Sequence, residues 1–186
     1  SISAVIGASW AGAKAMTATS GPGFSLMQES IGYAAFTETP CVIIDVQRAG
    51  PCTGQATRVG SGDIMQAKWG SHGDYQVIAL SPWSVQEMYE LTLHGFNLSE
   101  RYRVPTLVMA DEAVGHLREN LSIRAKVEVW DRKKKRGGSP FGTEEEEGIP
   151  PMPAFGEGER LLVTGCTHDA FGFRKKDDPE VHARWV

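Results

Sequence analysis

Short apolar runs alternate with stretches of helical periodicity along the first 120 residues of the chain. Each run has the length of a strand, and the runs lie at 15–19, 41–46, 77–80 and 106–110. Alternation of this kind is typical of βαβ units, whose right-handed crossovers bring the strands into one parallel sheet. The pattern therefore predicts an α/β fold with a mostly parallel sheet and helices on both faces.

The stretch after the first run carries apolar residues at intervals of three and four, which is one face of a helix. Pro22 suits the first helical turn. We therefore predict one helix that begins at Pro22 and buries Phe24, Met27, Ile31 and Ala34.

The stretch after the third run has the best-defined helix start in the chain. Ser84 and Glu87 form a capping box, and Trp83 is placed to pack on Met88 across it. A further short helix is expected around 64–67. After the fourth run, the carboxylates at 111 and 112 are expected to cap a helix rather than to act as acid or base.

The character of the chain changes after about residue 120. A basic run at 132–136 and an acidic run at 144–147 flank turn-forming residues. We interpret this segment as a solvated, mobile connector, with a docking role for the basic run as the alternative. Residues 148–156 are rich in Pro and Gly and should be extended, and 160–164 are expected to form one more strand.

Both ends of the chain read as interrupted helices. The first residues lack an initiator methionine and a lead-in strand, and 181–186 stop inside a helix-like pattern. We therefore expect an excerpt of a longer polypeptide, with an α/β domain at 1–120 and a charged connector with a Pro/Gly-rich, extended C-terminal appendage at 121–186.

Composition excludes several classes of protein. Of the 186 residues, 41% are apolar, which suffices for a core, and the net charge of -4 gives no basic face for nucleic acid. No apolar stretch of about eighteen residues and no signal-peptide order is present, so a cytoplasmic protein without a membrane segment is expected. The 3 cysteines are widely spaced, which argues against a disulfide framework and against a zinc or iron-sulfur site held wholly by this chain.

Two polar, Gly-rich loops follow the first two predicted strands. Residues 19–23 read Thr-Ser-Gly-Pro-Gly, and residues 47–58 carry Arg48 with two hydroxyls. Ligands of open α/β sheets bind at the carboxyl ends of strands, and a guanidinium suits a small carboxylate. The alternatives are a plain strand-to-helix turn for the first loop and an ion pair of Arg48 with Asp45 or Asp63.

Five motifs together make the sequence resemble a known family, the α subunits of 2-oxoacid:ferredoxin oxidoreductases, and most of all the 2-oxoglutarate type. The motifs lie at 19–29, 48–57, 62–74, 151–156 and 164–169. The resemblance implies a domain that binds the pyrimidine of thiamine diphosphate. It also implies a heterodimer (αβ) or its dimer, in which a separate β subunit binds the diphosphate through Mg2+ and carries a [4Fe-4S] cluster.

By the same resemblance, the enzyme oxidatively decarboxylates a 2-oxoacid with CoA to acyl-CoA and CO2 and reduces ferredoxin. Arg48 would meet the substrate carboxylate or keto oxygen as the catalytic residue, and Thr57 would lie near the substrate. Thr19, Ser20 and Gly21 would lie by the aminopyrimidine of the cofactor. The alternatives from other classes are a non-catalytic assembly subunit and a component of a non-redox thiamine-dependent decarboxylase.

The chain also departs from the family pattern. The glutamate that activates the pyrimidine would fall before Ser1, and the family's Tyr-Pro-Ile-Thr-Pro substrate motif is absent. Cys52 stands where related chains are expected to have serine, and a packing role is favoured over a reactive thiol. His72 could face the site or be structural, and the polar residues at 166–169 are read as a turn rather than as metal ligands.

Overall fold

The computed structural model describes residues 1–134, 139–142 and 148–183, and its centre is a parallel sheet of four strands. The strands are β1 (Met16–Thr19), β2 (Cys41–Gln47), β3 (Ile78–Leu80) and β4 (Pro105–Asp111), in the order β1-β2-β4-β3. All neighbours are parallel. The predicted fold class and all four predicted strands are confirmed.

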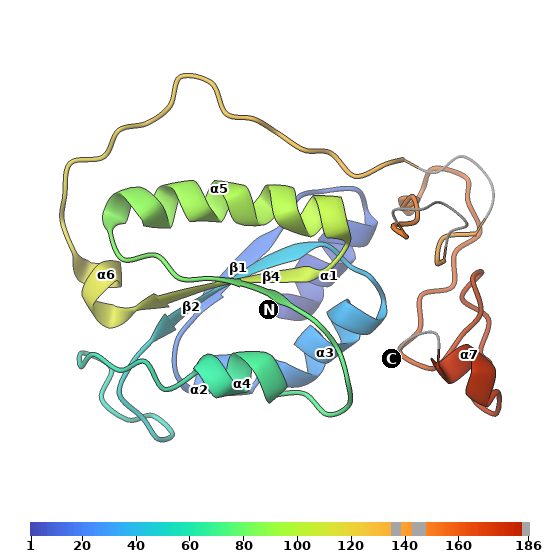
Figure 1. Ribbon diagram of the computed structural model, residues 1–186, viewed down its shortest axis with the longest axis horizontal. Helices are drawn as coiled ribbons and strands as arrows, with labels where there is room; N and C mark the ends of the chain where they lie inside the picture. The colour runs from blue at the N-terminus through green and yellow to red at the C-terminus, as the bar shows by residue number, and fades with distance from the viewer. Residues whose placement is uncertain (135–138, 143–147, 184–186) are drawn as a thin grey trace.

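Helices cover both faces of this sheet, with α5 on one face and α1 and α3 on the other (Figure 1). The helices are α1 (Ile2–Trp10), α2 (Pro22–Ser25), α3 (Gln28–Phe36), α4 (Ile64–Trp69), α5 (Val85–Tyr102), α6 (Glu112–His116) and α7 (Pro179–Ala183). Among the described residues, no helix is both long enough and apolar enough to cross a membrane.

The core explains why the middle strands are apolar at almost every position. Val42 and Ile44 of β2 pack with Val108 toward α5, while Cys41 and Ile43 point to the opposite layer. Successive side chains of a strand point to opposite faces, so a strand covered on both sides must be apolar throughout. The opposite layer is the larger one and contains the buried residues Ile2, Trp10, Phe24, Ile31, Leu107 and Met109.

The single helix predicted from Pro22 is divided into α2 and α3. The N–H of Met27 donates to the carbonyl of Phe24 at 3.0 Å, which is the tighter bond of a 3-10 turn. The new helix then starts, with the N–H of Ile31 bonded to the Met27 carbonyl at 2.9 Å. The predicted stripe is buried at Phe24, Ile31 and Ala34, which have no exposed surface, whereas Met27 is only partly buried against the same core.

The helix starts predicted from capping residues are confirmed. The hydroxyl of Ser84 accepts from the Glu87 N–H at 3.1 Å, and the carboxylate of Asp111 accepts from the Val114 N–H at 2.9 Å. The Trp83 side chain is 77% exposed, so its predicted packing on Met88 is wrong. The short helix expected around 64–67 is α4.

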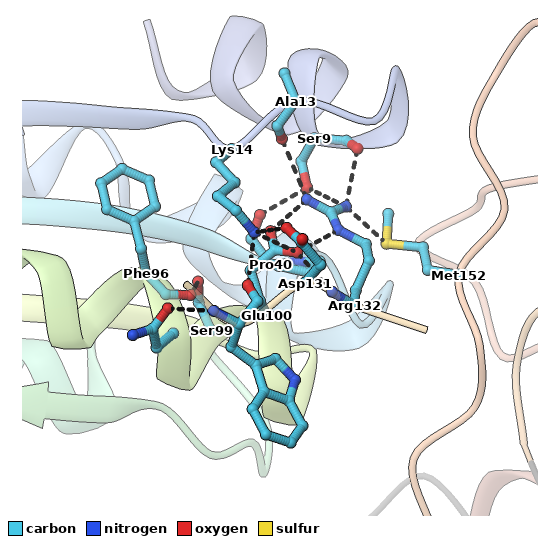
Figure 2. Close-up of polar contacts among 12 residues, drawn as sticks. Ser9, Ala13, Lys14, Pro40, Phe96, Ser99, Glu100, Asp131, Arg132 and Met152 are labelled. Atoms are coloured by element: carbon cyan, nitrogen blue, oxygen red, sulfur yellow. Dashed lines mark hydrogen bonds and ion pairs between the residues drawn. The ribbon is translucent and has the colours of Figure 1, made fainter. Parts of the chain in front are cut away.

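The connector after residue 120 is docked on the domain where it passes α1 and α5. Figure 2 shows Arg132 between these helices, with Glu100 of α5 accepting from its Nε at 2.7 Å. The same guanidinium donates to the carbonyls of Ser9 at 3.0 Å and Ala13 at 3.1 Å. The prediction of a solvated, mobile connector is therefore wrong for Arg132, while 135–136 and 144–147 lie outside the described residues.

A second buried arginine holds the following segment. Arg103 is 1% exposed, and its Nη1 donates to the carbonyls of Pro140 at 2.8 Å and Pro150 at 3.1 Å. Glu38 pairs with it at 3.4 Å, while burial lowers the pKa of the guanidinium to about 10. Residues 160–164 pack beside this region without forming the strand that the sequence predicts.

Candidate functional site at the carboxyl edge of the sheet

The loops that follow β1 and β2 lie side by side at one edge of the sheet. Parallel register pairs Thr19, the last residue of β1, with Asp45, so β1 ends two residues before β2 does at Gln47. The Ser20 hydroxyl donates to the carbonyl of Val46 at 2.6 Å and ties the first loop to the end of β2. Residues 19–23 and 48–58 therefore form one polar rim, as the strand order requires.

Arg48 lies directly over Gly21 of the neighbouring loop. A Cβ atom built on Gly21 would lie 2.7 Å from Nε and 3.0 Å from Cζ of Arg48, and the φ angle of Gly21 is 57°. A residue with a side chain would be strained by this φ and would collide with the guanidinium. The Arg48 guanidinium thus packs directly against Gly21, and only glycine leaves room for it there.

The guanidinium of Arg48 is oriented from its own loop. Its Nη2 donates to the carbonyl of Thr53 at 2.9 Å, whereas its Nε is buried and has no acceptor in the described part of the chain. No carboxylate within those ranges pairs with it, so the alternative of an ion pair with Asp45 or Asp63 is not observed. A cation held at a strand edge without a counter-ion is suited to an incoming anion.

Thr57 lies in a turn of the same loop. The turn is closed by the Arg58 N–H, which donates to the Gln55 carbonyl at 3.1 Å. The Ala49 N–H in turn donates to the Arg58 carbonyl at 2.9 Å, which returns the loop to the residue after Arg48. The Thr57 side chain is exposed. It is therefore accessible to a ligand at the rim.

The two hydroxyls of the first loop have different surroundings. Thr19 Oγ1 lies against Gly23 in the first turn of α2, where any Cβ would collide with it. The Ser20 hydroxyl is used by the bond to Val46. Ser20 therefore joins the two loops, and the absence of a side chain at Gly21 and Gly23 lets Arg48 and Thr19 pack against the backbone of the first loop.

Sequence reasoning missed a polar group beneath this rim. Gln47, the last residue of β2, donates from Nε2 to the Ala110 carbonyl at 3.2 Å and accepts the Asp63 N–H on Oε1 at 3.1 Å. Asp45 on the same side of β2 is fully buried. Burial and the neighbouring Asp63 raise the pKa of Asp45 to about 8. The only signal in the sequence was two polar residues in an apolar strand.

Of the remaining candidate residues, Cys52 belongs to the 48–58 loop, whereas His72 and the 166–169 segment lie outside this rim. His72 is exposed and lines a different cavity of about 340 Å3 with Tyr33 of α3. Asp169 Oδ1 accepts from the N–H groups of Phe171 at 2.9 Å and Phe173 at 3.0 Å, which is the turn predicted at 166–169. Cys52 is exposed with φ 57°, so it does not have the expected packing role.

The whole chain, residues 1–186, matches the family described as the thiamine-diphosphate-binding part of pyruvate flavodoxin/ferredoxin oxidoreductases. It is 57% identical to the 2-oxoglutarate synthase subunit KorA of Methanocaldococcus jannaschii, over 100% of this chain and 51% of that protein. It is 46% identical to the ketoisovalerate oxidoreductase subunit VorB of Methanothermobacter marburgensis, over 64% of this chain and 34% of that protein. The chain thus spans about half the length of the KorA relative and about a third of the length of the VorB relative.

A solved structure gives the same result for the fold. The 2-oxoglutarate:ferredoxin oxidoreductase from Magnetococcus marinus, solved with 2-oxoglutarate, coenzyme A and succinyl-CoA bound, matches with a TM-score of 0.86 at 36% identity. The match covers 99% of this chain and 33% of that chain. The predicted thiamine-binding fold is confirmed, and the chain belongs to the thiamine-diphosphate-binding family of pyruvate flavodoxin/ferredoxin oxidoreductases.

Proposed function

We propose that this chain is the thiamine-binding part of the α subunit of a 2-oxoglutarate:ferredoxin oxidoreductase. The reaction would convert 2-oxoglutarate and CoA to succinyl-CoA and CO2 and would reduce ferredoxin. The observation that carries the proposal is the Arg48 guanidinium, which rests on Gly21 at the carboxyl edge without a carboxylate partner in the described residues. The identity of 57% to a 2-oxoglutarate synthase subunit over the whole chain, against 46% to a ketoisovalerate oxidoreductase subunit over 64% of it, favours 2-oxoglutarate as the acid.

The first loop fits the aminopyrimidine of thiamine diphosphate. Gly21 has φ 57°, and the space beside Gly21 and Gly23 is taken by the Arg48 guanidinium and Thr19 Oγ1, which brings polar groups close to the backbone of this loop. Thr19, Ser20 and Gly21 would line this position. When bound, the cofactor supplies the carbanion chemistry of decarboxylation, and the chain supplies orientation and charge.

Arg48 and Thr57 would bind the 2-oxoacid. A planar guanidinium can donate two parallel hydrogen bonds to a carboxylate, which fixes the acid's orientation as well as its position. The Thr53 carbonyl already holds Nη2, so the side chain is oriented before the substrate arrives. The exposed Thr57 hydroxyl would donate to the same acid from the other side of the loop.

The remaining parts of the enzyme would come from a partner. We propose a β subunit that binds Mg2+ with the diphosphate and carries the [4Fe-4S] cluster, in an αβ or (αβ)2 assembly that transfers electrons to ferredoxin. The 57% identical relative is itself a subunit of a synthase, which supports a complex of several chains. The 3 free cysteines agree with a reducing, cytoplasmic location.

A substrate panel tests this proposal on the complete protein that contains this chain, co-expressed with its partner. Reduction of ferredoxin or viologen should require CoA and should be fastest, by kcat/KM, with 2-oxoglutarate rather than pyruvate or 3-methyl-2-oxobutanoate. Preference for another acid would change the assigned substrate but would leave the proposed reaction class unchanged. Release of CO2 without any reduction of the acceptor would instead indicate a non-redox decarboxylase.

Replacing Gly21 with alanine should displace Arg48 and lower kcat/KM for the 2-oxoacid. A strained left-handed residue costs about 1–3 kcal/mol, which corresponds to roughly 5- to 150-fold. Gly62→Ala is the matched control, because a Cβ there meets nothing within 4 Å. Steady-state kinetics of both variants, with circular dichroism as a check of folding, make the comparison. Equal kinetics in the two variants would show that Gly21 does not position the Arg48 side chain.

A further inference from the structure

Asp45 is a carboxyl group inside the sheet. It lies on β2 between β1 and β4, paired in register with Thr19 and Met109, and it has no exposed surface. Neither of its oxygens has a hydrogen-bond donor in the described ranges. An ionised carboxylate in such surroundings would be strongly destabilised.

The group that faces Asp45 is a second carboxyl. The side chain of Asp63, the residue before α4, lies within hydrogen-bonding reach of Asp45, and its Oδ2 is also buried without a donor in the part of the chain described. Two carboxylates are both acceptors, so a hydrogen bond between them requires a proton. A pair that shares one proton satisfies both groups and removes the repulsion between two negative charges.

Within the described residues, no other charged group acts on Asp45. The register neighbours from β1 and β4 are Thr19 and Met109, and Asp63 is the one titratable group that acts on Asp45. Arg48 is turned toward Gly21 and the Thr53 carbonyl instead. Within the described residues, a proton rather than a neighbouring cation therefore neutralises one of the two buried carboxylates.

The pair lies where the loop that carries Arg48 ends. This loop leaves β2 after Gln47 and reaches α4 at Asp63, and the Asp63 N–H donates back to Gln47 Oε1 at 3.1 Å. Asp45 and Gln47 are alternate residues of β2 and point to the same face. Asp45 thus interacts with the side chain of Asp63, and Gln47 binds its backbone N–H.

We propose that Asp45 and Asp63 share one proton, and that this carboxyl pair positions Arg48 by fastening the end of the 48–63 loop to β2. Asp45 is then a positioning residue, since it touches neither substrate nor cofactor. The activity consequence rests on the proposed function, whereas the fastening of the loop does not.

Loss of the shared proton should release the loop at alkaline pH. Burial and Asp63 place the pKa of Asp45 at about 8, above the unfolded value of about 3.9. The folded state therefore holds a proton that the unfolded chain has lost, and stability falls as pH rises from about 4 to about 8. Above that range, two adjacent carboxylates repel each other, and the loop is freed from the strand.

The test uses Asp45→Asn and Asp63→Asn in the complete protein with its partner. An amide can donate to the remaining carboxylate, so each variant keeps a bond at this position but loses the proton equilibrium. In the parent, KM for the 2-oxoacid should rise roughly tenfold from pH 7 to pH 9, because each pH unit above a pKa lowers the protonated fraction tenfold. In both variants this rise should be absent. Asp111→Asn is the control, because its carboxylate caps α6 at the same edge and should leave the rise unchanged.

Two physical readouts do not depend on activity. The infrared band of a protonated carboxyl should be present in the parent at pH 7 and absent from Asp45→Asn. Amide hydrogen exchange at 48–63 should be faster at pH 9 than base catalysis alone explains in the parent, and not in that variant. Absence of both signals from the parent would overturn the proposal. If both signals are present but the assembly does not oxidise 2-oxoacids, the carboxyl pair is supported and only the proposed function is refuted.

Discussion

Replacing Arg48 with alanine is expected to lower kcat/KM for the 2-oxoacid by about 100- to 1000-fold. Two charge-assisted hydrogen bonds to a carboxylate contribute about 3–4 kcal/mol, and each 1.4 kcal/mol corresponds to about tenfold. Arg48→Lys should recover only part of the loss, because an ammonium keeps the charge but not the planar pair of donors. Steady-state kinetics with varied 2-oxoacid, in the complete assembly at saturating CoA, would measure both variants.

Arg58→Ala is the matched control for Arg48. Arg58 belongs to the same loop and contributes backbone hydrogen bonds to Gln55 and Ala49, which alanine would keep. Its replacement removes one positive charge from the rim and should change kcat/KM far less. Parent-like kinetics for Arg48→Ala would remove Arg48 from the site and would favour a subunit whose loops serve assembly alone.

Replacing Glu100 with alanine is expected to destabilise the folded protein by about 3–5 kcal/mol, because it leaves a buried guanidinium without its counter-ion. The side chain of Glu100 is 3% exposed and that of Arg132 9%. Glu100 also accepts the backbone N–H of Arg132 at 3.2 Å and lies 3.4 Å from Lys14 Nζ. The connector should detach from α1 and α5 when this carboxylate is removed.

Denaturant unfolding of the complete protein, with hydrogen exchange at 130–134, would measure this effect. Glu90→Ala is the control on the same helix, because Glu90 pairs with Arg124 at 2.8 Å on the exposed surface and such pairs contribute little. Replacing Glu100 and Arg132 together by leucine and methionine should recover much of the loss, since no unpaired charge is then left behind. Equal effects of Glu100→Ala and Glu90→Ala would contradict a stabilising role for the buried cluster.

The sheet could be predicted because its signal is local. The run at 41–46 is apolar at nearly every position, and only a strand covered on both faces requires this. The starts of α5 and α6 were also predictable, because a cap acts within three residues of Ser84 or Asp111. The strand order then brought the two Gly-rich loops to one edge, as parallel topology demands.

Contacts between distant residues could not be predicted in the same way. Arg132 stands in a basic run that looks solvated, and its partner Glu100 is 32 residues away on a helix whose local pattern gives no sign of it. The packing of Arg48 against Gly21 likewise joins separate segments, and so does the carboxyl pair of Asp45 with Asp63. Each depends on how the elements pack, which periodicity and capping do not specify.

A structure of the complete assembly with 2-oxoglutarate bound, before decarboxylation, would show directly whether Arg48 receives the substrate. We expect a carboxylate or keto oxygen of the acid within hydrogen-bonding distance of the Arg48 guanidinium, beside Gly21 and close to Thr57. A 2-oxoglutarate molecule held by other side chains, with Arg48 still bonded only to the Thr53 carbonyl, would contradict the proposed site.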